Sequence, residues 1–228
     1  MIEVKNVSKR YGRKKVLEDI SFTAEKGEIT CLIGINGVGK TTTLKAIMGL
    51  TPYKGEITID QKKLDKNSYE KITYVPDAIT MLPSMSIFQA FDFMKDYYGS
   101  WNGKKADELL EFFKLKKEMR ISELSKGNTS KLNLLLGLAL DVDYILMDEP
   151  FSGIDMFSRE HIADVFASSL IEDKGVIITT HEIGDIEHLI DKAVLIEYGK
   201  VIKEFKPEDL RFSEGKSVVD VMREVYQQ

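Results

Sequence analysis

The sequence predicts an α/β fold in which a helical subdomain is inserted into a sheet core. Short apolar strands alternate with helical segments at both ends of the chain, and the stretch from about 84 to 140 has a mostly helical texture. No Pro-, Gly- or Ser-rich linker divides the 228 residues. Because such alternation gives a sheet covered by helices, we expect one domain over residues 1–228, with the helical subdomain at approximately 78–140.

Composition excludes several classes of protein. The apolar fraction is 43% and the charged fraction 30%, which is typical of a globular chain and not of a disordered one. Cys31 is the only cysteine, so an internal disulfide is impossible. The most apolar run, Leu134–Leu140, is far shorter than the ~20 residues of a membrane span. The net charge of −5 argues against sequence-independent nucleic-acid binding, and Met1–Tyr11 reads as a strand, so we expect a cytosolic protein without a signal peptide.

The first half of the chain contains the strands that lead to a glycine-rich loop. Two strands flank the basic turn Lys9–Lys15, and their apolar residues alternate with polar ones. The apolar segment Glu28–Gly34 runs directly into glycines, and Thr41–Leu50 has helical spacing. Further strands are expected at Gly55–Asp60 and Lys71–Val75, and Pro76 breaks the chain after them.

The second half begins with helices and returns to strand–helix alternation. One apolar stripe has the spacing i, i+4, i+7, i+11, which predicts a helix; it comprises Ile87, Phe91, Met94 and Tyr98. Other expected helices are Ala106–Phe113, Ser130–Leu140, a segment before Val176, Ile183–Ile190 and Val218–Tyr226. Expected strands are Tyr144–Met147, Val176–Thr179, Ala193–Ile196 and Lys200–Phe205, the last two separated by Tyr198-Gly199.

The segment Gly34–Thr41 fits the phosphate-loop pattern G-x-x-x-x-G-K-[ST] in full. Glycines let several backbone N–H groups approach phosphate oxygens, and the helix that follows adds a positive dipole. Lys40 is placed to reach the β and γ phosphates, and Thr41 to ligate Mg²⁺. A strand precedes the loop and a helix follows it, which distinguishes it from an ordinary glycine-rich turn.

Two carboxylates end the apolar segment Tyr144–Met147. Asp148 is placed to hold the Mg²⁺ shell beside Thr41, and Glu149 to face the γ-phosphate, where it could polarise water or accept its proton. An ordinary strand end with solvated acids is the alternative, and the phosphate loop disfavours it. A guanine-reading Asn-Lys-x-Asp sequence does not occur, so a P-loop GTPase is excluded.

At this point the sequence resembles the ATP-binding cassette (ABC) family, the nucleotide-binding subunits of membrane transporters. The likeness covers nearly the whole chain, and six motifs occur in family order. They are Tyr11 with Val16 at the adenine-stacking position, the Walker A loop Gly34–Thr42, the signature Leu124–Asn128, Walker B Leu146–Pro150, the D-loop Phe151–Asp155, and His181 of the H-loop.

The resemblance implies a P-loop NTPase core with an N-terminal antiparallel β subdomain and the inserted helical subdomain. It implies ATP and Mg²⁺ as ligands and two cassettes that close head to tail around two ATP molecules. The catalytic residues would be Glu149 and His181, and the Mg²⁺ ligands Thr41, Asp148 and Asp77. The residues expected to bind nucleotide are Tyr11, Val16, Asn36, Gly37, Gly39, Lys40, Thr41 and Thr42, with Ser125, Gly127 and Asn128 serving the partner's ATP. His161 and His188 match no motif and read as ordinary helix residues.

Two positions depart from the family pattern. Asp77 replaces the glutamine of the Q-loop, and a carboxylate there could still reach the metal. The signature has Lys126 for a glycine and Asn128 for a glutamine. We expect ATP hydrolysis that is slow in the isolated chain or best with a different partner cassette.

The preferred reading is the energy-coupling subunit of a transporter whose membrane-spanning subunit is a separate chain. The variant signature and the acidic Q-loop resemble bacterial export cassettes for drugs or peptides. The location would be cytoplasmic, on the inner face of the membrane, with a second cassette, identical or different, as partner and no nucleic acid. The alternatives are a cassette ATPase that acts on nucleic acid or the ribosome, and a nucleotide sensor without turnover.

Aromatic side chains are frequent over Ile87–Trp101. The simple interpretation is the small core of the helical subdomain. The alternative is that some of them, such as Phe93 and Tyr97, line the groove that receives a coupling helix of the transmembrane subunit, as the resemblance implies.

Overall fold

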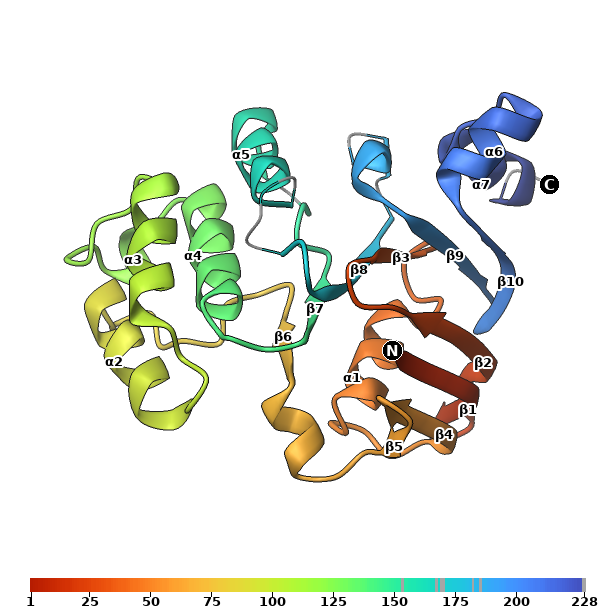
Figure 1. Ribbon diagram of the computed structural model, residues 1–228, viewed down its shortest axis with the longest axis horizontal. Helices are drawn as coiled ribbons and strands as arrows, with labels where there is room; N and C mark the ends of the chain where they lie inside the picture. The colour runs from red at the N-terminus through yellow and green to blue at the C-terminus, as the bar shows by residue number, and fades with distance from the viewer. Residues whose placement is uncertain (153, 167, 169–170, 182, 185, 227–228) are drawn as a thin grey trace.

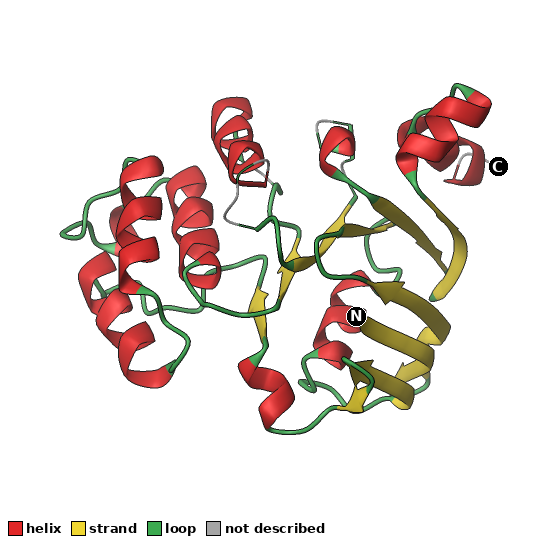
Figure 2. Ribbon diagram, in the orientation of Figure 1, coloured by secondary structure: helices red, strands yellow, loops and turns green. Residues whose placement is uncertain are grey.

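The computed structural model describes residues 1–152, 154–166, 168, 171–181, 183–184 and 186–226, which form two β-sheets with helices around them (Figures 1 and 2). The smaller sheet is antiparallel, with strand order β2-β1-β4-β5. Its strands are β1 (Ile2–Tyr11), β2 (Lys14–Ala24), β4 (Lys54–Ile59) and β5 (Lys62–Lys63). The first two are longer than the sequence pattern indicated, and they enclose a turn of only two residues.

The larger sheet has the order β10-β9-β3-β8-β7-β6. The strands from β9 to β6 in this order are parallel to one another, and β10 pairs with β9 in the antiparallel direction. Both residues between β9 and β10, Tyr198 and Gly199, have positive φ, as a tight hairpin turn requires. The α/β class predicted from the sequence is confirmed. The strands are β3 (Ile29–Ile33), β6 (Ile72–Val75), β7 (Tyr144–Asp148), β8 (Gly175–Thr180), β9 (Lys192–Glu197) and β10 (Lys200–Phe205).

Two hydrophobic cores lie on the two faces of the larger sheet, because successive strand residues point to opposite faces. On β3, Cys31 and Ile33 belong to one core and Leu32 to the other. The first core continues into the helices α2 to α4, and the second is shared with the smaller sheet and α1. Burial on both faces explains why these strands read as continuous apolar runs.

Seven α-helices surround the sheets in the described part of the chain. Figure 1 shows α2, α3 and α4 as a group beside β6, whereas α1 lies next to the smaller sheet and α6 and α7 lie beyond β10. Their bounds are α1 (Lys40–Ile47), α2 (Ile87–Tyr97), α3 (Gly103–Phe112), α4 (Lys126–Leu138), α5 (Met156–Phe166), α6 (Pro207–Glu214) and α7 (Val218–Tyr226).

Helix α2 follows its predicted stripe closely. Ser86 caps its N-terminus in a reciprocal pair with Gln89. Ile87, Phe91 and Met94 are buried in the core between the helices, but Tyr98, the last residue of the stripe, is 45% exposed. The helix ends at Tyr97, so Tyr98 has extended backbone and leaves the stripe.

The C-terminal third differs from the sequence prediction in two places. The helix expected over Ile183–Ile190 is wrong: the described part of that range contains a three-residue 3₁₀ turn, Glu187–Leu189, and residues 182 and 185 lie outside the described residues. The helix α6 was not expected from the sequence, because the segment has no clear apolar stripe. In the structure it buries Pro207 and Leu210, whereas Phe212 is 95% exposed. His161 lies on α5, whereas His188 lies in the 3₁₀ turn.

Among the described residues, the helices are too short or too polar for any of them to cross a bilayer.

Candidate active site

The phosphate loop joins β3 to α1 and closes tightly on the smaller sheet. Gly39 has φ 116°, and a Cβ on it would approach Leu17 Cδ2 to 2.5 Å and Val16 O to 2.9 Å. Gly37 also has positive φ, at 85°. Glycine is therefore required at Gly39, both by backbone conformation and by the space available. The loop lets main-chain N–H groups and the first turn of α1 surround an anion.

Lys40 lies inside this loop. Its side chain is 5% exposed, and Nζ donates hydrogen bonds to Gly34 O at 2.7 Å and Ile35 O at 3.3 Å. The same ammonium forms an ion pair with Glu149 Oε1 at 3.1 Å. A buried cation held by carbonyls and one carboxylate is placed to meet the phosphates of a nucleotide that enters the loop.

Asp148 ends β7 beside the loop and is 1% exposed. Its Oδ1 accepts hydrogen bonds from Thr41 Oγ1 at 2.9 Å and Thr179 Oγ1 at 2.6 Å, and Oδ2 accepts one from Tyr74 OH at 3.1 Å. Burial, and then the Asp148 charge, raise the pKa of Tyr74, so this phenol remains a donor. Carboxylate and hydroxyl oxygens are the ligands that Mg²⁺ prefers. The positions of Thr41 and Asp148 are therefore consistent with two ligands of one Mg²⁺ ion.

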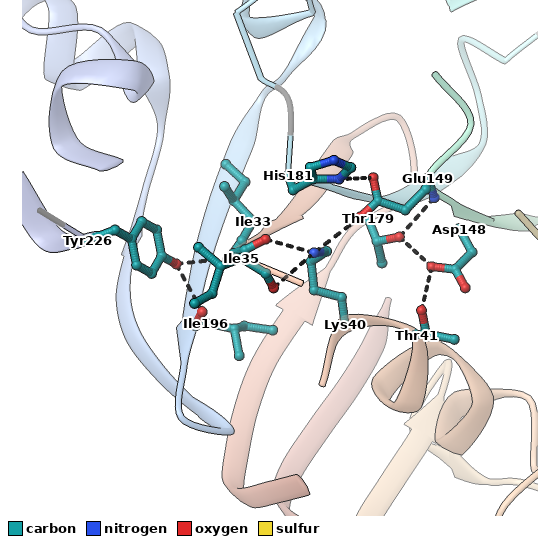
Figure 3. A network of polar contacts seen from close by, with 11 residues as sticks. Ile33, Ile35, Lys40, Thr41, Asp148, Glu149, Thr179, His181, Ile196 and Tyr226 are labelled. Carbon is teal, nitrogen blue, oxygen red and sulfur yellow. Dashed lines mark hydrogen bonds and ion pairs between the residues drawn. The ribbon is translucent and has the colours of Figure 1, made fainter. Parts of the chain in front are cut away.

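Glu149 follows with left-handed backbone, φ 48°, which is unusual for a residue other than glycine. Its amide donates to Thr179 Oγ1 at 3.0 Å and to Thr179 O at 3.1 Å. Its carboxylate divides between two partners, with Oε1 on Lys40 and Oε2 2.9 Å from His181 Nδ1. A carboxylate only accepts hydrogen bonds, so His181 Nδ1 has the proton in this contact. Figure 3 shows these groups as one network around Lys40.

The predicted adenine-side residues lie next to the loop. Tyr11 ends β1 and is 50% exposed, and Lys9 Nζ lies 4.7 Å from its ring centroid. Hydrogen bonds to its phenol from Thr51, and then from Thr42 of α1, lower the pKa of Tyr11. Val16 is half-buried on β2, where its carbonyl faces Gly39. Asn36 is exposed at the tip of the loop, as Gly37 is.

The signature residues lie at the start of α4, apart from α1 and the phosphate loop (Figure 1). Ser125 is exposed and caps the helix, with Oγ accepting from Asn128 N at 3.3 Å. Gly127 is buried in the first turn. Among the described residues, no hydrogen bond joins Ser125, Gly127 or Asn128 to the phosphate loop of the same chain.

Asp77 is exposed and directly follows Pro76, whose carbonyl accepts a 2.6 Å hydrogen bond from Asn133 Nδ2 of α4. Its charge contributes to the raised pKa of Tyr74, after burial and the effect of Asp148. The loop with Asp77 is thus connected on one side to the signature helix and on the other to the Walker B carboxylate. Among the residues that the structure describes, Asp77 forms no direct hydrogen bond with Thr41 or Asp148.

Sequence reasoning missed three residues of the network. Thr179 and Tyr74 bind Asp148 from the neighbouring strands. Tyr226 of α7 donates to Ile196 O at 2.9 Å, beside the start of the loop (Figure 3). Thr179 and Tyr74 read as ordinary strand residues, and Tyr226 as the end of a tail helix. One signal was available: Tyr74 and Thr179 lie near the carboxyl ends of predicted strands, and ligands of open α/β sheets bind at that edge.

The phosphate loop between β3 and α1, with the acidic pair at the end of β7, defines a P-loop nucleoside triphosphatase. The family model described as "ABC transporter" matches residues 17–152. An uncharacterised ABC transporter ATP-binding protein of Methanocaldococcus jannaschii is 33% identical over 219 residues, covering 92% of this chain and 79% of the relative. The chain belongs to the ABC transporter family, as a nucleotide-binding subunit.

Other relatives and solved structures agree with this assignment. The Nod factor export ATP-binding protein I of Burkholderia lata is 35% identical over 230 residues, covering 96% of this chain and 76% of that protein. The linearmycin resistance ATP-binding protein of Bacillus subtilis is 33% identical over 211 residues, covering 89% and 68%. A solved ATP-binding subunit of an ABC transporter superposes with a TM-score of 0.88 at 26% identity and covers 99% of both chains. A cassette solved as a dimer has a TM-score of 0.79 at 26% identity, covering 90% of this chain and 98% of that one.

Proposed function

We propose that this subunit hydrolyses ATP with Mg²⁺ and that the resulting closure and opening of a cassette dimer power a separate transmembrane subunit. The observation that supports the chemistry most directly is the position of Glu149. Its carboxylate lies between Lys40 and His181, within one residue of the carboxylate that fits the metal. Phosphoryl transfer to water requires a base, a cation that binds phosphate and ligands for a metal ion. All of these lie at this one loop.

Each residue of the site would have a separate role in ATP binding or hydrolysis. Lys40 and the loop N–H groups would bind the phosphates, and Thr41 and Asp148 would hold Mg²⁺, with Asp77 as a further proposed ligand. When bound, Mg²⁺ neutralises charge on the phosphate oxygens. Glu149 would orient the attacking water and accept its proton, and His181 would hold the Glu149 carboxylate in place and contact the γ-phosphate. Tyr11 and Val16 would bind the adenine.

Dimer closure would supply the signature residues. Ser125 and Asn128 lie at the surface end of α4, away from the phosphate loop of their own chain. A helix N-terminus with its unpaired N–H groups suits the phosphates of the partner's ATP. Similar solved cassettes include one described as dimeric and one described as a dimer bound to ADP and phosphate. We propose that two copies of the cassette close head to tail here, with residues of approximately 78–140 moving as a helical subdomain.

An apolar groove is the proposed docking site for the transmembrane subunit. It encloses about 530 Å³ between α2, α4 and the β6 side of the core. Leu50 and Tyr98 on its walls are 63% and 45% exposed, and Asn133 connects it to Pro76 beside Asp77. An occupant would therefore be adjacent to the loop that lies between the signature helix and the nucleotide site.

The names of two relatives support the proposed direction of transport. The Burkholderia relative is named for Nod factor export and the Bacillus relative for linearmycin resistance. We propose that this chain likewise serves an exporter, of a drug-like or peptide cargo, from the cytoplasmic face of the membrane.

The closure step is tested with Glu149→Gln, which should bind ATP but hydrolyse it far more slowly than the wild type. We expect a dimer by size exclusion with light scattering in Mg-ATP and a monomer in Mg-ADP. A monomer in both, with ATP binding confirmed separately, would contradict a symmetric homodimer and indicate that closure needs a different cassette or the membrane subunit.

A further inference from the structure

One buried hydroxyl contacts both members of the acidic pair. Thr179 lies on β8 and is 0% exposed. Its Oγ1 donates to Asp148 Oδ1 at 2.6 Å and accepts from Glu149 N at 3.0 Å (Figure 3). No other side chain in the described network bonds to both residues.

The sheet register places this hydroxyl. Asp148 pairs with Thr179 between the parallel strands β7 and β8, so their side chains emerge on the same face. A hydroxyl has one proton and two lone pairs. Because the carboxylate only accepts and the amide only donates, both hydrogen bonds have a single possible direction, and they use complementary parts of the hydroxyl.

Each hydrogen bond fixes a different functional group. The first holds Asp148 Oδ1 toward Thr41, which donates to the same oxygen at 2.9 Å. The second, with the 3.1 Å bond to Thr179 O, anchors the amide of Glu149 in its left-handed conformation. That conformation is disfavoured for glutamate and persists only where the surroundings determine it. It directs the carboxylate toward Lys40 and His181.

We propose that Thr179 is a positioning residue for ATP hydrolysis, acting through Asp148 on the metal site and through Glu149 on the attacking water. This inference rests on the proposed function, because it assigns a role within the same reaction. The role belongs to the hydroxyl and not to the bulk of the side chain. Valine would therefore abolish it at nearly constant volume, and serine would preserve it.

The test compares Thr179→Val and Thr179→Ser with Thr30→Val. Thr30 is a matched control, since it is also 0% exposed in the same sheet, and its hydroxyl donates to Glu28 and not to the site. Steady-state ATPase assays give kcat and KM, and titration with a fluorescent ATP analogue, with and without Mg²⁺, gives the gain in affinity due to the metal. Thermal melting reports folding of each variant.

For Thr179→Val we expect kcat to fall roughly tenfold or more, as for loss of a hydrogen bond to a buried charged group. The gain in ATP affinity due to Mg²⁺ should shrink, while affinity without Mg²⁺ stays the same. Thr179→Ser should stay within about threefold of wild type because it keeps both hydrogen bonds. Thr30→Val should keep wild-type kinetics even where its melting temperature falls.

Wild-type kcat and a wild-type gain from Mg²⁺ in Thr179→Val would overturn the proposal, and so would an equal defect in Thr179→Ser. If Thr179→Val does not fold, Thr179→Ala removes the same hydroxyl without placing a methyl group against the carboxylate. Absence of turnover in the wild type would count against the proposed function, whereas the Mg²⁺-dependent binding would still decide whether Thr179 acts through Asp148 on the metal site.

Discussion

Lys40 Nζ and Glu149 Oε1 lie 3.1 Å apart, joining the cation of the phosphate loop to the proposed catalytic base. Both side chains are largely buried, at 5% and 15% exposure, so the pair is poorly screened by solvent. An ATP phosphate and the Glu149 carboxylate would compete for the same ammonium. We therefore expect nucleotide binding to release Glu149 from Lys40 toward the attacking water.

Replacing Glu149 by glutamine should separate binding from turnover. The amide removes the competing charge from Lys40, so ATP affinity should equal or exceed that of wild type. Turnover should fall on the order of a hundredfold, because general-base catalysis contributes about that much or more. Equilibrium titration and a phosphate-release assay measure the two quantities.

Lys40→Ala is the matched comparison and should lose both binding and turnover. It removes the cation that the phosphates meet and leaves the Glu149 carboxylate without its partner. Normal hydrolysis in Glu149→Gln would show that another group is the base.

The polar contacts of Tyr226 predict a structural role for the C-terminal helix at the phosphate loop. Its phenol donates to Ile196 O at 2.9 Å, lies 3.4 Å from Ile33 O, and would be 3.3 Å from a Cβ on Gly34. Burial, with the charge of Glu197, raises the pKa of Tyr226 to about 12, so the phenol stays a donor at neutral pH. Tyr226→Phe should lower the free energy of unfolding by about 1 kcal/mol.

Urea unfolding of Tyr226→Phe and of Tyr198→Phe measures this effect. Tyr198 is 86% exposed, so its hydroxyl should contribute little. We also expect Tyr226→Phe to weaken ATP binding a few-fold, because Ile33 directly precedes the loop. Equal stability of the two variants would contradict the assigned contact.

The nucleotide side of the molecule could be predicted from sequence because it depends on short, fixed spacings. Glycine at Gly39 and the strand before the loop are local requirements, and the apolar run before Asp148 identified its strand. The structure brings Thr41 and Asp148 to 2.9 Å although they are 107 residues apart. That closeness follows from the neighbouring places of β3, β8 and β7 in the sheet.

The rest depended on tertiary contacts that no local pattern contains. Thr179 has the β-propensity of any strand threonine, and its role arises from its register opposite Asp148. The segment Ile183–Ile190 has apolar residues at helical spacing, yet Ile183, Ile186 and Ile190 are buried without an α-helix in the described part. These side chains are buried by packing against the rest of the protein, although their own segment has little regular secondary structure.

Asp60 predicts an acid-dependent contribution to stability. Burial by itself would raise its pKa, but hydrogen bonds from Tyr144, the Met1 ammonium and Lys71 outweigh burial and lower the pKa of Asp60. A carboxylate with a depressed folded-state pKa stabilises the protein fully above its unfolded pKa of about 3.9, and this contribution is lost as the pH falls below that value.

Asp60→Asn should therefore lower the melting temperature at pH 7. Below about pH 4, its stability should fall less with decreasing pH than that of the wild type. Asp96→Asn, at an exposed site on α2, is the control and should leave the pH profile unchanged. Parallel profiles for wild type and Asp60→Asn would argue against this assignment.

The aromatic residues of α2 and the adjoining groove predict how the subunit docks on its membrane partner. Phe93 and Tyr97 are 39% and 72% exposed, with ring centroids 4.5 Å apart, and Tyr98 lines the groove. Exposed aromatic rings have large apolar area and few rotatable bonds, which is typical of interface anchors. A glutamate at any of these positions would place a charge in the contact.

Phe93→Glu, Tyr97→Glu and Tyr98→Glu should each reduce co-purification with the transmembrane subunit, by tenfold or more in affinity where the ring is an anchor, since loss of an anchor costs about 2 kcal/mol. Nucleotide binding should be unchanged. Phe212→Glu is the control, because Phe212 is 95% exposed on α6, beyond β10 and away from α2 (Figure 1). Loss only in Tyr98→Glu would restrict docking to the groove itself, and unchanged co-purification of all three would place the contact on another face of the cassette.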